Sequence, residues 1–133
     1  MTEEATEYCE TTRNVKVSVV PRFSPERSQP RAGKYFFLYT VTITNQGAET
    51  VQLISRHWVI TDAHGEVEEV RGAGVVGEQP VLNPGAGFRY TSGCPLGTPF
   101  GCMEGSYQMH TTSGDEFEVR IPPFALRNPD LMQ

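Results

Sequence analysis

The stretch YQMHTTSGDEFEVRI, residues 107–121, decides the fold class of this chain of 133 residues. Apolar or small side chains recur at every second position on both sides of Ser113-Gly114, which is a turn dipeptide. They are Tyr107, Met109 and Thr111 before the turn, and Phe117, Val119 and Ile121 after it. A period of two on both sides of a turn predicts an antiparallel β-hairpin with one buried face.

Upstream of this hairpin, more short runs rich in aromatic and β-branched residues are separated by Gly, Pro and Asn. They are residues 15–23, 35–44, 51–62, 66–71 and 88–91. No segment keeps a helical period. Seven or eight short strands at regular turn spacing predict an all-β fold, a two-sheet antiparallel sandwich of the immunoglobulin-like or fibronectin type III-like kind.

The same pattern predicts which side chains face the core. In residues 35–44 the odd-numbered face is apolar along its whole length, so we expect it to be buried. Residues 51–62 are partly apolar on both faces, which allows a β-bulge, and we expect Trp58 to lie between the sheets. Pro21 places its run at a sheet edge or a strand end. Tyr107 is expected to form the tyrosine corner typical of such sandwiches.

Segments rich in proline and glycine are predicted to be connections between strands. These are residues 24–34, 72–80 and 94–103, and Pro122-Pro123 is expected to end the last strand. Residues 1–10 contain four glutamates and show no apolar periodicity. We therefore predict a flexible acidic arm at residues 1–11, a sandwich domain at residues 12–126 and a C-terminal tail at residues 127–133.

Charge and composition narrow the classes of partner. The net charge is −5, of which residues 1–10 hold −4, so the remainder carries −1. A near-neutral body lacks the basic field of nucleic-acid-binding proteins, so no nucleic-acid partner is expected. With no apolar run long enough to cross a bilayer and no signal peptide, we expect no membrane association. Three cysteines without a disulfide spacing favour free thiols and a cytoplasmic location.

The histidines and cysteines form no recognisable catalytic or metal motif. His57, His64 and His110 are the candidate bases, and Cys94 or Cys102 the candidate nucleophile, but no nucleophile elbow or cysteine-protease signature surrounds them. No C-x-x-C or H-x-x-x-H pair is present. We therefore predict a non-enzymatic protein with no catalytic residue, no metal site and no cofactor. A divalent-metal sensor is the weakest of the functional alternatives.

Residues 71–77, RGAGVVG, contain the pattern G-x-G-x-x-G after a predicted strand. Gly72, Gly74 and Gly77 could bring backbone N–H groups close to a phosphate, and Arg71 could add a charged fork. Pro80 and the prolines that follow rule out the helix that the dinucleotide fingerprint requires. Two interpretations stay open, a weak and salt-dependent anion site at these four residues, or a plain connection between the sheets.

Two longer segments carry a family resemblance. They read RHWVITDAHGEVEEVRGAGVVGEQPVLNPGAGFRYTSG, residues 56–93, and LGTPFGCMEGSYQM, residues 96–109. Together they resemble the ApaG family, and the similarity extends from about Val15 to Phe124. The resemblance implies a fibronectin type III-like or immunoglobulin-like sandwich, in agreement with the strand pattern. It also implies a pyrophosphate-holding role for the glycine motif, which falls on Gly72, Gly74 and Gly77.

The resemblance further implies a function. Related domains in some F-box proteins and in a polymerase-interacting protein are associated with protein contacts, and the bacterial family is tied to cobalt and magnesium efflux. A chain without a membrane span could only regulate such efflux. The leading hypothesis is a non-catalytic module that binds an unidentified protein partner. The alternative is a nucleotide or polyphosphate binding protein that holds pyrophosphate in the glycine loop. Open sheet edges would also allow a homodimer.

Overall fold

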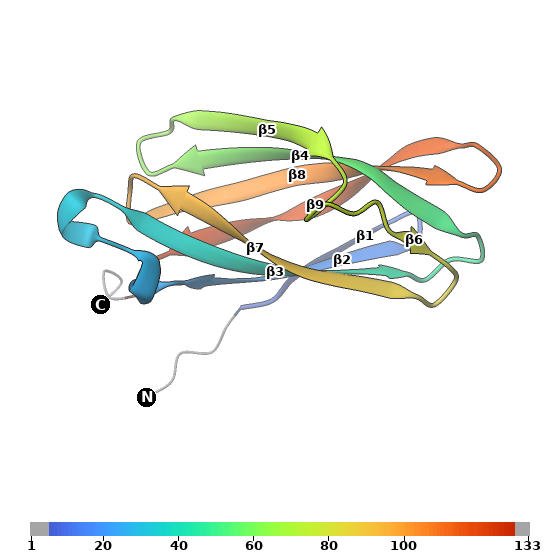
Figure 1. The fold of residues 1–133 in the computed structure, drawn as a ribbon, viewed down its shortest axis with the longest axis horizontal. Helices are drawn as coiled ribbons and strands as arrows, with labels where there is room; N and C mark the ends of the chain where they lie inside the picture. The colour runs from blue at the N-terminus through green and yellow to red at the C-terminus, as the bar shows by residue number, and fades with distance from the viewer. Residues whose placement is uncertain (1–5, 130–133) are drawn as a thin grey trace.

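The computed structural model describes residues 6–129 and has two antiparallel sheets packed face to face (Figure 1). The first sheet has the order β1 (Tyr8–Thr12), β2 (Val15–Phe23), β3 (Tyr35–Asn45), β7 (Gly87–Leu96). The second has the order β5 (Val67–Ala73), β4 (Val51–Asp62), β8 (Phe100–Thr111), β9 (Glu116–Arg127), with β6 (Val81–Leu82) also paired to β4. Two 3₁₀ turns, η1 (Pro25–Arg27) and η2 (Pro30–Ala32), join β2 to β3. The predicted all-β sandwich is confirmed.

The core lies between the sheets and is formed by the alternating faces that the sequence predicts. The odd-numbered side chains of β3 from Phe37 to Ile43 are buried, as expected. Trp58 of β4 is 3% exposed. Its ring lies 5.3 Å from that of Tyr39 on the opposite sheet and 5.9 Å from that of Phe124 on β9, measured between centroids. The predicted position of Trp58 is therefore confirmed.

A β-bulge in β4 changes which residues face inward. The register with β8 shifts between Leu53 and Ser55, so Val51 and Leu53 face the core before the bulge and Trp58 after it. This explains why residues 51–62 look apolar on both faces. It also turns Arg56 toward the interior, because Arg56 has the same parity as Trp58. An arginine on the inner face of a sandwich is unusual and needs a polar partner.

One lateral side of the sandwich is closed by β1 and β9. The Nε atom of Arg120 lies 3.3 Å from a carboxylate oxygen of Glu10, and the Arg120 amide donates to the Thr12 hydroxyl at 3.2 Å. The prediction of a flexible arm was therefore wrong for residues 8–11, which form a strand because β2 and β9 supply their partners. Residues 1–5, also assigned to that arm, lie outside the described residues.

The predicted edge position of Pro21 agrees with the pairing of β2. At Pro21 this strand extends beyond β1 and pairs only with β3, so it is an edge there.

Two predicted interruptions of strands were wrong. Residues 94–103 belong largely to β7 and β8, which are separated only by residues 97–99. Pro122-Pro123 does not end β9, which continues to Arg127. The register between β8 and β9 shifts at Met103/Gly105, so the prolines sit in a bulge on an edge strand, where a missing N–H breaks no ladder bond. Of the predicted tail, residues 130–133 lie outside the described residues.

Tyr107 does not form a tyrosine corner. Its side chain is fully buried, and its hydroxyl hydrogen-bonds to the hydroxyl of Tyr90 rather than to backbone upstream. Burial raises the pKa of both tyrosines. The pair joins β7 of one sheet to β8 of the other, so it stabilises the sandwich from within the core.

Candidate functional site

The glycine-rich segment forms a second, smaller hairpin, which we call the glycine hairpin (residues 71–80). The amide of Val75 donates to the carbonyl of Glu78 at 2.8 Å, and the amide of Glu78 donates back at 2.9 Å. This closes a turn whose two central residues, Val76 (φ 43°) and Gly77 (φ 82°), are both left-handed. Such a turn matches the twist of its flanking strands. In Figure 1 the segment descends from the end of β5 toward β6.

The glycines of this segment allow close approach rather than flexibility. A Cβ at Gly74 would lie 2.2 Å from the carbonyl oxygen of Glu78, and its φ of +61° also favours glycine. A Cβ at Gly72 would lie 2.9 Å from the guanidinium nitrogens of Arg56. Gly77 has open space around it and is needed only for the turn. Two of the three motif glycines are therefore explained by packing within the chain.

Arg56 holds the base of the glycine hairpin. Its Nη1 donates to the carbonyls of Ala73 at 3.0 Å and Gly74 at 2.9 Å, which gives this inward-facing arginine the partners it needs. The amide of Gly74 and the side-chain amide of Gln79 both donate to the Ile54 carbonyl, each at 2.8 Å. The side chain of Val75 is 1% exposed. These contacts fix the hairpin to β4 as a rigid protrusion.

Several amides of the predicted anion site have acceptors within the protein. Among the loop amides, those of Gly74, Val75 and Glu78 already donate to carbonyls of the protein. No acceptor within the described chain is found for the amides of Val76 and Gly77 at the tip, or for that of Gln79. Arg71 is exposed, and its Nη2 lies 3.5 Å from a carboxylate oxygen of Glu69. Anion binding at Arg71, Gly72, Gly74 and Gly77 stays a prediction.

The histidines of the outer face pair with carboxylates. The Nε2 of His57 lies 2.7 Å from Glu69, and this hydrogen bond is the main cause that lowers the pKa of the Glu69 carboxyl. The Nε2 of His110 lies 3.2 Å from Glu116. Within residues 6–129 no group of three or more His, Cys, Asp or Glu side chains is placed to hold a metal ion. Over the same residues, no helix has the length and apolar character required to span a bilayer.

The tip of the glycine hairpin carries an exposed aliphatic residue in an unfavourable conformation. Val76 is 56% exposed, and its φ of 43° lies in the left-handed region that β-branched residues rarely adopt. Asn, Asp or Gly is the usual residue at this turn position.

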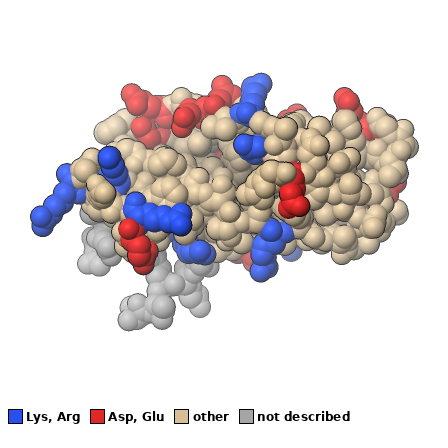
Figure 2. All heavy atoms as spheres, viewed as in Figure 1, with Lys and Arg blue, Asp and Glu red and all other residues tan. Residues whose placement is uncertain are grey.

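Charged side chains are distributed unevenly over the face drawn in Figure 2. Basic side chains gather at the end of the sandwich where η1 and η2 lie, and acidic ones lie along the β5 edge.

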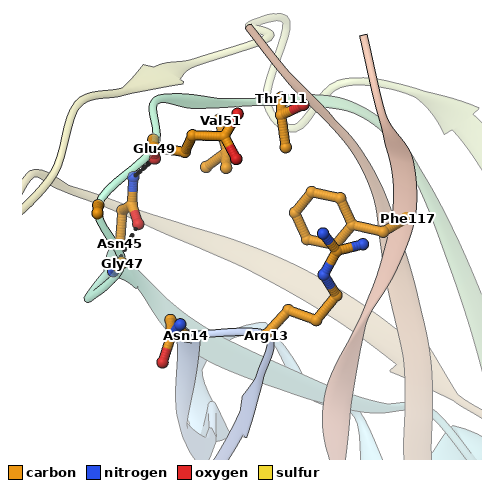
Figure 3. A pocket seen from close by; sticks show the side chains of 9 residues that line it. Arg13, Asn14, Asn45, Gly47, Glu49, Val51, Thr111 and Phe117 are labelled. Carbon is orange, nitrogen blue, oxygen red and sulfur yellow. Dashed lines mark hydrogen bonds between the residues drawn. The ribbon is translucent and has the colours of Figure 1, made fainter. Parts of the chain in front are cut away.

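A second candidate site, which we call the end cavity, opens at one end of the sandwich and has a volume of about 370 Å³ (Figure 3). The turn between β1 and β2, the loop between β3 and β4, and the β8–β9 hairpin contribute its walls. The lining residues are Arg13, Asn14, Asn45, Gly47, Ala48, Glu49, Val51, Thr111 and Phe117. The guanidinium carbon of Arg13 lies 4.5 Å from the centre of the Phe117 ring.

Sequence reasoning missed Arg56, Val76 and the end cavity. The signal for Arg56 lay in residues 51–62, where the apolar side chains change from odd-numbered to even-numbered positions. Such a change requires a β-bulge between them, and a bulge there turns Arg56 inward. The signal for Val76 was a valine directly before a glycine, where a hairpin turn normally has Asn or Asp. The end cavity brings together residues from three distant turns, and no local pattern connects them.

The sequence of this chain is similar to those of proteins named ApaG. A family model described as the ApaG domain matches residues 25–111. A Protein ApaG of Bradyrhizobium sp. is 58% identical over 92% of this chain and 95% of its own length. One of Rhodopseudomonas palustris is 57% identical over the same shares.

Solved structures show the same fold. The crystal structure of a putative ApaA protein from Bordetella pertussis has a TM-score of 0.85 at 55% identity, covering 86% of this chain and 94% of that one. The C-terminal domain of wzt has a TM-score of 0.54 at 11% identity and shows a likeness of fold alone. The resemblance expected from residues 56–109 is confirmed, and this chain belongs to the ApaG family.

Proposed function

We propose that this protein is a non-catalytic binding module that contacts a protein partner through the tip of the glycine hairpin. The observation that carries the proposal is the exposed Val76, an aliphatic side chain held in a left-handed conformation. A β-branched residue in that region costs about 1–2 kcal/mol relative to glycine. More than half of the residue is in solvent, so its side chain adds little to folding, and a contact made outside this chain is the natural reason for a valine there.

The surroundings of Val76 suit recognition of a protein. The base of the hairpin is fixed by Arg56 and by the buried Val75, so little conformational freedom would be lost on binding. An apolar tip flanked by polar residues such as Glu78 and Gln79 fits a partner with a small apolar pocket and a polar rim. We further propose a cytoplasmic location, because the free cysteines of the described chain suit a reducing compartment.

The link to cobalt and magnesium homeostasis belongs to the same proposal. A module of this kind would act on such a system by docking to one of its proteins. A competing mode of association is a homodimer formed through the edge strands β5 or β7. The molecular mass of the purified chain in analytical ultracentrifugation tests it. Phosphate binding at the hairpin is the alternative function, and its test is given among the predictions below.

The experiment is an affinity pull-down from the native lysate with three forms of the chain. The wild type and Val67→Asn, which alters an exposed valine at the far end of β5, should retain the same stoichiometric partner. Val76→Asn should lose it. Because asparagine tolerates the left-handed region, Val76→Asn should also melt at or above the wild-type temperature, so the loss cannot come from unfolding. Retention by Val76→Asn, or no stoichiometric partner for the wild type, would overturn the proposal.

A further inference from the structure

The end cavity presents two opposite charges that do not pair with each other. No described residue accepts a hydrogen bond from the Arg13 guanidinium or forms an ion pair with it; its contact is with the face of the Phe117 ring. Of the Glu49 carboxylate, one oxygen accepts the Ser113 hydroxyl at 2.9 Å and the other has no donor in the described chain. In Figure 3 the two side chains enter the cavity from opposite sides.

Two other polar lining residues, Asn45 and Thr111, are already used by the fold. The side-chain amide of Asn45 donates to the carbonyls of Glu49 at 2.7 Å and Leu82 at 2.9 Å, and its oxygen accepts the Gly47 amide at 2.9 Å. The Thr111 hydroxyl contacts Ser113 and accepts the amide of Asp115. The polar side-chain groups of the lining that remain unpaired within the described chain are therefore the Arg13 guanidinium, one oxygen of Glu49 and the side-chain amide of Asn14, and only the first two carry a charge.

The backbone places Arg13 in this position at a cost. Arg13 has a φ of 46° and Asn14 a φ of 66°, so both central residues of the β1–β2 turn are left-handed. Asparagine is common in that region and arginine is not. The carbonyl of Asn14 accepts the Gln46 amide at 2.7 Å, which ties the turn to the β3–β4 loop on the other side of the cavity. A strained residue that carries an unpaired charge into a cavity indicates a binding role.

We propose that the end cavity binds a small zwitterion of the amino-acid class, with its carboxylate on Arg13 and its ammonium group on Glu49. The face of the guanidinium is covered by Phe117, which leaves its N–H edges free for the two-point contact that carboxylates make. The walls formed by Val51 and Phe117 suit an aliphatic or aromatic side chain. A volume of about 370 Å³ lies within the range of small-ligand pockets.

Charge matching explains why a zwitterion is favoured over a simple anion or cation. A ligand with a single charge would pair with only one of Arg13 and Glu49. It would cover the remaining charged side chain without compensating its charge, at a desolvation cost. The end cavity shares no residue with the glycine hairpin, so this inference is independent of the proposed protein contact.

The test is an NMR titration of the isotope-labelled chain with L-leucine, L-phenylalanine, L-glutamine and the dipeptide glycyl-leucine. At least one of these should shift the amides of residues 13–14, 46–50 and 111–117. The N-acetyl and amide derivatives of that ligand, which each lack one charge, should bind about tenfold more weakly. No shift at these amides with any probe, or equal affinity for the charged and blocked forms, would overturn the inference.

Two variants assign the charges. Arg13→Gln should no longer distinguish the ligand from its amide, and Glu49→Gln should no longer distinguish it from its N-acetyl derivative. Arg31→Gln removes the same charge as Arg13→Gln but lies in η2, outside the cavity, and should behave as the wild type. Both cavity residues are exposed, so their variants should keep the wild-type melting temperature. Unchanged discrimination in both variants would contradict the assignment.

Discussion

Trp58 offers the sharpest test of how the two sheets are packed, through the substitution Trp58→Ala. The side chain is 3% exposed and contacts Tyr39 of the opposite sheet and Phe124 of its own. Truncation of a buried tryptophan costs about 3–5 kcal/mol. Its neighbours stand on paired strands and cannot collapse into the space, so we expect the upper part of that range, about 4–5 kcal/mol. A domain of this size has a free energy of unfolding of roughly 5–15 kcal/mol, so the variant should remain mostly folded for any wild-type value above about 6 kcal/mol.

Urea denaturation followed by far-ultraviolet circular dichroism measures the loss without relying on fluorescence, because Trp58 is the only tryptophan. With an m value of about 2 kcal/mol per molar, the midpoint should fall by about 2 M. Val67→Ala is the control, since this valine is 61% exposed on the same sheet and should change stability by less than about 0.5 kcal/mol. A loss below about 1 kcal/mol in Trp58→Ala would refute the packing described here.

Three further predictions concern the hairpin and the thiols. Gly74→Ala and Gly77→Ala both place a side chain at positive φ, at about 1–2 kcal/mol, but only Gly74 would also meet the Glu78 carbonyl at 2.2 Å. Thermal denaturation should therefore show the larger loss for Gly74→Ala, and equal losses would contradict this. Burial raises the pKa of Cys94 to about 11, so at pH 8 it stays a neutral thiol. A soluble disulfide reagent should modify the two exposed cysteines rapidly and Cys94 only on unfolding, and fast reaction of all three would be the opposing result. Pyrophosphate titrated at low salt should shift the amides of residues 71–78 weakly and lose this effect at physiological salt, and unmoved amides there remove the phosphate alternative.

Much of the fold could be predicted because its strands carry a period of two. The hairpin at residues 107–121, the inward face of β3 and the core position of Trp58 all follow from side chains alternating across a pleated strand. These are local properties, and no knowledge of the partner strand is needed to find them.

The missed parts of the fold depend on tertiary contacts. β1 has few apolar residues and is held by β2 and β9, so its sequence looks like a solvated arm. Gly101 of β8 was assigned to a predicted loop, but it and Gly105 instead allow close approach of the neighbouring strand. A Cβ at Gly105 would lie 2.1 Å from the His57 carbonyl, and one at Gly101 2.5 Å from that of Thr61. The same sequence signal therefore marks a turn or a tight strand contact.

The candidate sites were predicted less completely than the fold. The glycine motif drew attention to residues 71–77, but the hairpin was not predicted. The interpretation of a connection between the sheets was wrong, because the segment joins β5 and β6, which both pair with β4 in one sheet. Nor did the sequence reveal that contacts with Arg56 and Glu78 require glycine at Gly72 and Gly74. Nor did it show that Val76 is strained and exposed. Those properties depend on the β4 bulge and on the turn type, which are set by the register of the whole sheet.

The central claim, docking of a protein partner on the tip of the glycine hairpin, is tested most directly by mapping the interface. The partner retained by the wild-type chain would be added to isotope-labelled protein, and amide shifts recorded over the described residues. We expect the largest shifts at residues 75–78, and we expect them to vanish in Val76→Asn. Shifts centred on the outer faces of β4, β8 and β9, or on the end cavity, with the hairpin amides unmoved, would contradict it.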